Sequence, residues 1–235
     1  MKKKTPQKVI SRIWKIFLLL ICSMVLFTIF QVVALKYINP FSTPNTAWEW
    51  AESIWTRNPA KQPVYIWKNI ELISPHLQKA VIAAEDQRFF SHNGFDIDQI
   101  KQAIQTLVKR KRLRGASTIS MQTARSVFWL SSRTITRKIA EVYYTVLIEL
   151  IWDKQRILEM YLNTVDWGTG VTGAEAAARK YFSTSARNLT MEQAALMTAV
   201  LPNPHKWPVK NPSPYIQKRQ IQIMKIMEKM PLLKN

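Results

Sequence analysis

Glycine is scarce in this chain of 235 residues: it occurs five times, where average usage would give roughly sixteen. Turns with a positive φ usually need glycine, so this scarcity favours helices over tight hairpins. The five glycines are Gly94, Gly115, Gly168, Gly170 and Gly173. Their few positions therefore mark places where the backbone has a special requirement.

Cysteine and histidine are nearly absent as well. The single cysteine, Cys22, excludes an intramolecular disulfide framework and a multi-cysteine zinc site. The only histidines are His76, His92 and His205, which makes a histidine-rich metal centre unexpected. The sequence therefore predicts no resident metal site.

Acidic residues are also in the minority. There are 15 against 34 lysines and arginines, which gives a formal net charge of +19. Such an excess predicts an anionic partner: a nucleic acid, a membrane surface or a phosphorylated substrate. The hydrophobic content of 47% excludes general disorder, and the length suits one domain with a small appendage.

One long uncharged segment lies near the N-terminus. Residues 16–35 read IFLLLICSMVLFTIFQVVAL, which as a helix spans roughly the 30 Å hydrocarbon core of a bilayer. A cleaved signal peptide would have an apolar region of about 7–15 residues and a small-residue cleavage site. This segment is longer and lacks a good cleavage site, so we predict an uncleaved single-pass anchor rather than a signal peptide or a buried core helix.

The flanking charges predict the orientation of this anchor. Six cations and no acid precede it: Lys2, Lys3, Lys4, Lys8, Arg12 and Lys15. The positive-inside rule places residues 1–15 in the cytoplasm and the remainder outside. An exported domain rarely meets nucleic acid, so we expect no nucleic-acid partner. Anionic lipid headgroups or a lipid phosphate remain as candidates.

Residues 36–63 are predicted to be a juxtamembrane connector rich in proline and aromatic residues. Trp48, Trp50 and Trp55 can lie at the headgroup level or pack into the first lobe's core, and the sequence leaves both open. Beyond the connector, capping residues precede a series of apolar-periodic segments. They are Ser74, Asp96, Ser117 or Thr118, Thr134, Asp153 and the box formed by Thr190 and Gln193.

These signals predict a mainly α fold. Helices are expected over 75–85, 97–112, 118–130, 134–152, 154–163, 194–201 and 215–230. No strand pattern of period two stands out, and no internal repeat is present. The remainder, residues 64–235, is expected to form one domain.

Residues that could take part in catalysis are most concentrated in the segment AVIAAEDQRFFSHNGFDIDQI. An apolar helix face ends in Glu85 and Asp86, followed by aromatics, His92 and Gly94. Adjacent acids cannot share a helix face, so one is expected to point into a cleft as a general base or acid while the other supports it. The alternative is an ordinary solvated acidic pair.

Three further segments carry weaker signals. Gly115 and Ser117 open a helix start that can bind an anion, although such sequences are common caps. Arg133, Arg137 and Glu141 are spaced by four, which fits either a phosphate clamp or a surface helix with salt bridges. Three glycines after the segment KQRILEMYLN suggest close backbone packing.

Taken together, the four segments resemble the peptidoglycan glycosyltransferase family, lysozyme-like enzymes that polymerise lipid II. The residues that match the family's motifs are Glu85, Asp86, Phe89, His92 and Gly94; Gly115, Ser117, Thr118, Ile119 and Gln122; Arg137, Lys138 and Glu141; and Arg156, Ile157, Leu158, Tyr161, Leu162 and Asn163. The resemblance implies a two-lobed helical domain. We expect no penicillin-binding transpeptidase domain, which makes the chain similar to the monofunctional biosynthetic members.

The resemblance also implies a mechanism. Glu85 acts as general base on the 4-hydroxyl of the acceptor's GlcNAc, which attacks C1 of the donor's MurNAc. Undecaprenyl pyrophosphate leaves, and the configuration at C1 is inverted to a β-1,4 bond. Glu141 belongs to the donor side, near the pyrophosphate or a bridging divalent cation, Mg²⁺ or Mn²⁺. No cofactor is expected to be tightly bound.

The remaining assignments follow from the same resemblance. The residues expected to bind substrate are Ser117, Gln122, Arg125, Arg133 and Arg137, and those expected to support the site are Asp86, Phe89, His92, Gly94 and Asn163. Lipid II, the growing glycan chain, membrane lipids and cell-wall synthesis proteins are the implied partners. The implied location is the inner (plasma) membrane, with a periplasmic domain.

Two departures and two alternatives stand beside the resemblance. Met121 occupies the place of a usual glutamine, and Arg125-Ser126 that of a usual Lys-Asn. Arginine keeps the charge and offers a bidentate fork to phosphate. A lysozyme-like glycan hydrolase would share the fold but need neither an anchor nor a row of arginines. An inactive scaffold would have lost the acids, whereas Glu85 and Glu141 are both present.

Overall fold

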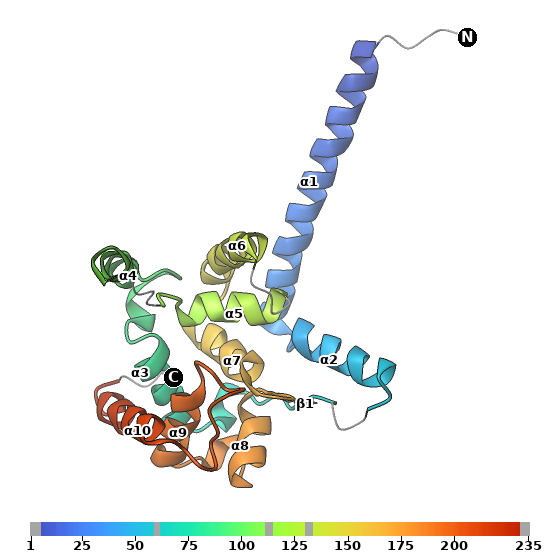
Figure 1. The fold of residues 1–235 in the computed structure, drawn as a ribbon. Helices are drawn as coiled ribbons and strands as arrows, with labels where there is room; N and C mark the ends of the chain where they lie inside the picture. The colour runs from blue at the N-terminus through green and yellow to red at the C-terminus, as the bar shows by residue number, and fades with distance from the viewer. Residues whose placement is uncertain (1–5, 59–61, 111–114, 130–133, 231–235) are drawn as a thin grey trace. The chain divides into compact units, whose positions relative to one another are not determined.

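The computed structural model describes residues 6–58, 62–110, 115–129 and 134–230 (Figure 1). The chain divides into two compact units, residues 1–39 and 40–235. In the first, α1 (Pro6–Tyr37) is one continuous helix. Its part from Arg12 to Tyr37 is long and apolar enough to cross a membrane. The helix continues past the apolar run 16–35 at both ends.

The second unit is mainly helical, as predicted. Its α-helices are α2 (Pro44–Trp55), α3 (Pro75–Glu85), α4 (Ile97–Arg110), α5 (Ile119–Phe128), α6 (Ile135–Ile151), α7 (Lys154–Thr164), α8 (Ala174–Phe182), α9 (Met191–Val200) and α10 (Pro214–Met227). Short 3-10 helices are η2 (Ile70–Leu72), η3 (Phe89–Ser91) and η4 (Ala186–Asn188). The strands are β1 (Val64–Tyr65), β2 (Asp166–Gly168) and β3 (Val171–Thr172).

The helix starts confirm the predicted caps. Side-chain oxygens accept hydrogen bonds from first-turn amides at each predicted position, with Thr118 rather than Ser117 capping α5. Thr190 and Gln193 form the complete capping box. These signals are local, because each involves residues two or three positions apart.

Two elements differ from the sequence-based expectation. The predicted connector 36–63 contains the helix α2, which starts with a capping box of Thr43 and Thr46. A three-stranded sheet of order β1-β3-β2 is also present, with β1 parallel and β2 antiparallel to β3. Its strands of two or three residues are too short to produce an alternating pattern in the sequence.

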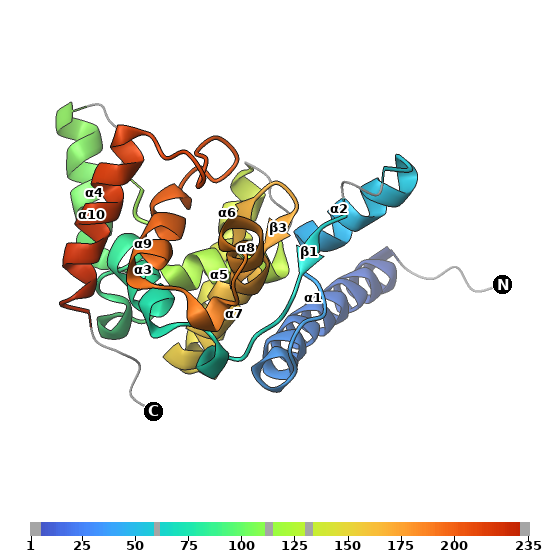
Figure 2. The same ribbon diagram turned by 90° about the horizontal axis from the view of Figure 1, so that it is seen from below.

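Two central helices organise the core of this unit. α5 packs against α6 and α7, and α3 packs against α9 and α10. Figure 1 shows α4 and α6 on one side of α5, with α8, α9 and α10 on the other side of α7. Figure 2 shows α4 and α10 at the same edge of the unit. The largest fully buried side chains include Trp167, Tyr161 and Phe89.

Asn163 joins α7 to the segment that precedes α3. Its Oδ1 accepts from the Lys68 amide at 2.8 Å, and its Nδ2 donates to the Lys68 carbonyl at 2.8 Å. The side chain is fully buried. Asn163 therefore acts as a backbone clamp within the core.

Gly173 lies directly against this clamp, and replacing it with alanine is expected to destabilise the fold. Its φ is +85°, and a Cβ atom would lie 2.7 Å from the Asn163 carbonyl oxygen. Because both the backbone angle and the contact oppose a side chain, we expect Gly173→Ala to lower the free energy of unfolding by more than about 1 kcal/mol. Thermal or urea unfolding measures this loss.

Gly115→Ala is the matched control, since its φ is not positive and, among the described residues, no atom beyond its chain neighbours lies within 4 Å of its Cβ position. It should change the free energy of unfolding by less than about 0.5 kcal/mol. Equal stability of the two variants would contradict the packing argument.

Candidate active site

A cavity of about 500 Å³ lies where the end of α3, the start of α4, α5 and α10 meet. The residues of interest in its lining are Glu85, Asp86, Gln99, Ser117, Gln122, Arg125 and Arg219. The cavity therefore brings together Glu85 and three of the predicted substrate-binding residues, from segments well separated in sequence.

Glu85 is the last residue of α3 and faces this cavity. The buried apolar side of α3, which includes Leu77 and Val81, fixes the helix in the core and leaves its C-terminal end at the cavity wall. Glu85 Oε2 accepts a hydrogen bond of 3.0 Å from Gln122 Nε2. Its Oε1 lies 3.7 Å from Arg219 Nη2. The carboxylate is thus oriented from two sides while remaining open to the cavity.

Asp86 turns the other way, toward the N-terminus of α5. Its Oδ2 accepts from the Ile119 amide at 3.0 Å, and its Oδ1 lies 2.9 Å from His92 Nε2. The first amides of a helix lack intrahelical acceptors and carry a partial positive charge, so a carboxylate is stabilised there. The arrangement agrees with the expected division between one acid at the cleft and one support.

The loop after Asp86 is fixed by the other residues of the same motif. Phe89 is fully buried, and Lys154 Nζ lies 4.7 Å from its ring centroid. The Gly94 carbonyl accepts from Thr118 Oγ1 at 2.6 Å, and a Cβ on Gly94 would lie 2.8 Å from Thr145 Cγ2. This glycine therefore allows the loop to approach α5 and α6 closely.

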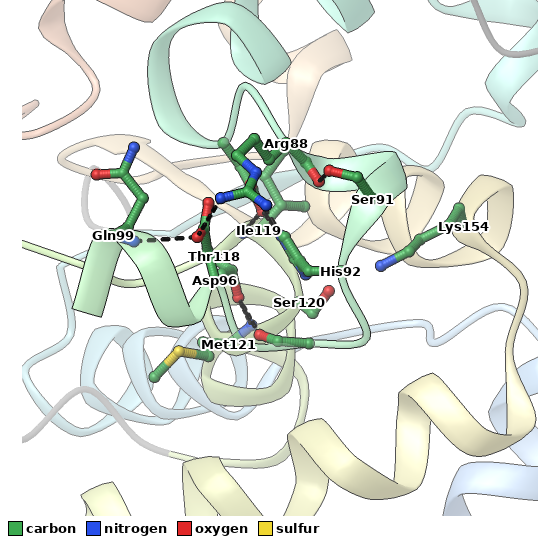
Figure 3. A network of polar contacts seen from close by, with 12 residues as sticks. Arg88, Ser91, His92, Asp96, Gln99, Thr118, Ile119, Ser120, Met121 and Lys154 are labelled. Carbon is green, nitrogen blue, oxygen red and sulfur yellow. Dashed lines mark hydrogen bonds and ion pairs between the residues drawn. The ribbon is translucent and has the colours of Figure 1, made fainter. Parts of the chain in front are cut away.

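Asp96 ties the same loop to α4 (Figure 3). Its Oδ1 accepts from the amides of Asp98 at 3.1 Å and Gln99 at 3.0 Å, which caps the helix. The same oxygen lies 3.3 Å from Arg88 Nη1. Because Gln99 lines the cavity, this network sets the position of one wall.

Three predicted substrate-binding residues come from α5 and the residues just before it. Ser117, Gln122 and Arg125 all line the cavity. Met121 does not: its side chain is buried, and its amide donates to Thr118 Oγ1 at 3.2 Å (Figure 3). Methionine at position 121, in place of the usual glutamine, therefore removes no side-chain amide from the cavity lining in this chain.

Glu141 and Arg137 lie outside the lining of this cavity, on α6. Glu141 is buried, and its Oε2 lies 3.0 Å from Arg137 Nη1 while its Oε1 lies 2.5 Å from Lys138 Nζ. The spacing of four thus produces an ion pair. Arg133 lies outside the described residues.

The predicted divalent cation does not fit the residues around Glu141 as they stand. Each carboxylate oxygen is already engaged by a cationic side chain. Within the described residues, no group of three acidic, histidine or cysteine side chains could hold a metal ion. The cation stays a prediction, and the reaction proposed for this site does not depend on it.

The sequence did not predict that Arg219 lines the cavity or that Tyr161 is fully buried. Arg219 comes from α10, and no local pattern distinguishes it from the lysines and arginines around it. Tyr161 is fully buried: burial raises its pKa well above the usual value, the charges of Glu85 and Asp86 raise it further, and Arg125 lowers it. Tyr161 therefore lies close to the groups that form the cavity wall.

Comparison with known proteins identifies the family. A family model described as Transglycosylase matches residues 53–228. The chain belongs to the transglycosylase family. The match includes all the helices that line the cavity, and it begins inside α2, earlier than the expected domain boundary at residue 64.

Several relatives in this transglycosylase family cover nearly the whole chain. A protein of Shewanella oneidensis named biosynthetic peptidoglycan transglycosylase is 46% identical over 203 residues, 86% of each chain. One with the same name from Aeromonas hydrophila is 44% identical over 227 residues, 97% of this chain and 94% of its own. One from Bacteroides thetaiotaomicron is 44% identical over 206 residues, 87% and 82% of the two chains.

Proposed function

We propose that this chain is a peptidoglycan glycosyltransferase that joins lipid II units into β-1,4-linked glycan strands. The observation that carries the proposal is the position of Glu85, whose carboxylate faces the cavity beside Gln122 and Arg125. The transglycosylase match over residues 53–228 and the names of the relatives support the same reaction.

Deprotonation of the acceptor is the first task of the site. A sugar hydroxyl is a poor nucleophile at neutral pH, so a positioned base must remove its proton as the new bond forms. Glu85 is suited to this because Gln122 holds one oxygen by hydrogen bonding and Arg219 approaches the other. The 4-hydroxyl proton passes to Glu85 while the hydroxyl oxygen bonds to C1 of the donor.

Stabilisation of the leaving group is the second task. The bond from C1 to the pyrophosphate oxygen breaks, and the negative charge that grows there needs cations already in place. Arg125 lies in the cavity lining and can form two parallel hydrogen bonds to a phosphate. Arg137 and Glu141 are proposed to act farther along the donor side. Attack opposite the leaving group inverts the configuration at C1.

Exposed apolar side chains on two helices support a lipid-linked substrate. They are Ile97, Ile104, Leu107 and Val108 on α4, and Ile135, Ile139, Val146 and Leu150 on α6. Exposed apolar side chains of this kind mark interaction surfaces, among them surfaces that contact a membrane. We propose a single-pass protein of the inner (plasma) membrane, with residues 1–15 in the cytoplasm and the catalytic domain outside.

Incubation of the purified full chain with labelled lipid II tests the proposal. Glycan polymer and undecaprenyl pyrophosphate should appear together, because each transfer releases one lipid pyrophosphate. A lysozyme-like hydrolase would instead release reducing sugar from finished glycan and leave lipid II unused. That outcome would replace the proposed reaction with the hydrolytic alternative.

Removal of the Arg125 charge is expected to slow polymerisation strongly. Arg125→Ala should lower kcat/KM for lipid II by about 10²-fold, since one preorganised group that stabilises a growing anion contributes about that much. Steady-state assays with lipid II measure the change. Arg125→Lys should retain much of the activity because it keeps the positive charge.

Arg187→Ala is the matched control, because Arg187 is exposed on η4 and outside the cavity lining. It should behave like the unmodified protein. Equal losses for Arg125→Ala and Arg187→Ala would refute a specific role of Arg125 at the leaving group.

A further inference from the structure

α2 has its polar side buried and its apolar side exposed. Thr46 and Ser53, about two turns apart, are 3% and 2% exposed. Trp48 and Trp55, also about two turns apart, are 62% and 89% exposed. The two pairs lie on nearly opposite faces, since a shift of two residues rotates a helix position by about 200°. This is the reverse of an ordinary surface helix.

The buried side of α2 contacts other parts of the domain. Thr43 and Thr46 form the capping box, and α2 packs against α5. Glu49 lies in a cavity of about 240 Å³ that Asp166 and His205 also line. Asp166 Oδ2 lies 2.7 Å from His205 Nε2. The pKa of Glu49 is raised, mainly by burial and to a smaller extent by the negative charge of Asp166. These contacts fix the rotation of α2 and keep its tryptophans outward.

The outward side of α2 is an apolar surface without charge. Its members are Ala47, Trp48, Trp50, Ala51, Ile54 and Trp55, all of them exposed. On a helical projection they occupy an arc of about 160°, and the two glutamates of the helix fall outside it. We call this set the tryptophan face.

The place of α2 in the chain indicates what covers the tryptophan face. Only residues 38–43 separate it from α1, a length that spans at most about 25 Å. α1 can cross a membrane, so α2 must stay near the bilayer surface. Tryptophan is enriched at that depth, because the apolar body of its ring contacts lipid while its N–H reaches water.

We propose that α2 is an interfacial helix whose tryptophan face inserts into the headgroup and upper acyl region of the membrane. The polar side then holds the catalytic domain through α5, so α2 fixes the domain's rotation and height above the bilayer. Helices with one apolar and one polar side bind membranes in this way.

A single fluorescent label distinguishes lipid from water at the tryptophan face. Cys22 is the only cysteine, so Cys22→Ser gives a background in which Ile54→Cys can carry an environment-sensitive dye. Ile221→Cys on α10 is the matched control, because Ile54 and Ile221 are both 54% exposed. The full chain is placed as single copies in phospholipid nanodiscs, with and without lipids that carry a quencher near the headgroup.

The label at position 54 should show blue-shifted emission and lose most of it to the lipid-borne quencher, while the label at 221 should show neither effect. Adding Trp48→Ser and Trp55→Ser should remove the effect at position 54, and both sites are exposed enough for the fold to tolerate the change. Water-like emission at both positions would overturn the proposal. Shielding at position 54 without lipid quenching would also overturn it and indicate a protein partner on this face.

Discussion

Glu85→Gln is expected to reduce lipid II polymerisation by at least about 10²-fold while leaving the fold intact. Glutamine has nearly the same shape as glutamate and can still accept the hydrogen bond from Gln122 Nε2. It cannot take the proton of the attacking hydroxyl, so the chemical step loses its base. Single-turnover assays with labelled lipid II and thermal unfolding of the same preparation measure the two effects separately.

Glu228→Gln provides the matched control for this variant. Glu228 is an exposed residue at the end of α10 and does not line the cavity. The same chemical change at that position should leave both the rate and the stability unaltered. If Glu85→Gln formed glycan at nearly the unmodified rate, Glu85 would not be the base and the proposed reaction would need another centre.

Asp86→Ala is expected to damage stability and activity together. It removes the acceptor of the buried Ile119 amide and the partner of His92, and both groups stay in the interior. A buried donor left without an acceptor costs roughly 1–3 kcal/mol, so we expect the free energy of unfolding to fall by about 3 kcal/mol. Denaturant unfolding measures this fall.

Activity of this variant should also drop at temperatures where it remains folded, because Asp86 fixes the end of α3 that presents Glu85. Asp86→Asn is the informative companion: its Oδ1 can still accept from the Ile119 amide, but the negative charge at the start of α5 is lost. It should recover most of the stability, since a charge at a helix end contributes about 0.3–1 kcal/mol. Two variants of equal stability would show that the hydrogen bonds are unimportant.

The sequence predicted helices better than it predicted the walls of the cavity. Ser74, Thr118 and Asp153 cap their helices as expected because a cap depends only on the next few residues. The strands β1 and β3 could not be found in this way, since each consists of two residues and pairs with a segment distant in the chain. Local pattern carries no information about such a pairing.

The same distinction explains the candidate site. Glu85, Gln122 and Arg125 were found because they lie within recognisable segments, and the structure places them in one cavity. Arg219 was not found, because its approach to Glu85 depends on how α10 packs against α3. Glu141 shows the converse: its motif was found, but its position outside the cavity lining follows only from the packing of α6.

The contribution of α10 to the cavity has a consequence for biosynthesis. Every other element that lines the cavity precedes α10 in the chain, so Arg219 reaches Glu85 only after those elements have been synthesised. A chain that is still being synthesised therefore contains Glu85 before α10, which completes the cavity wall, is present. The cavity is therefore complete only when nearly the whole chain has been synthesised.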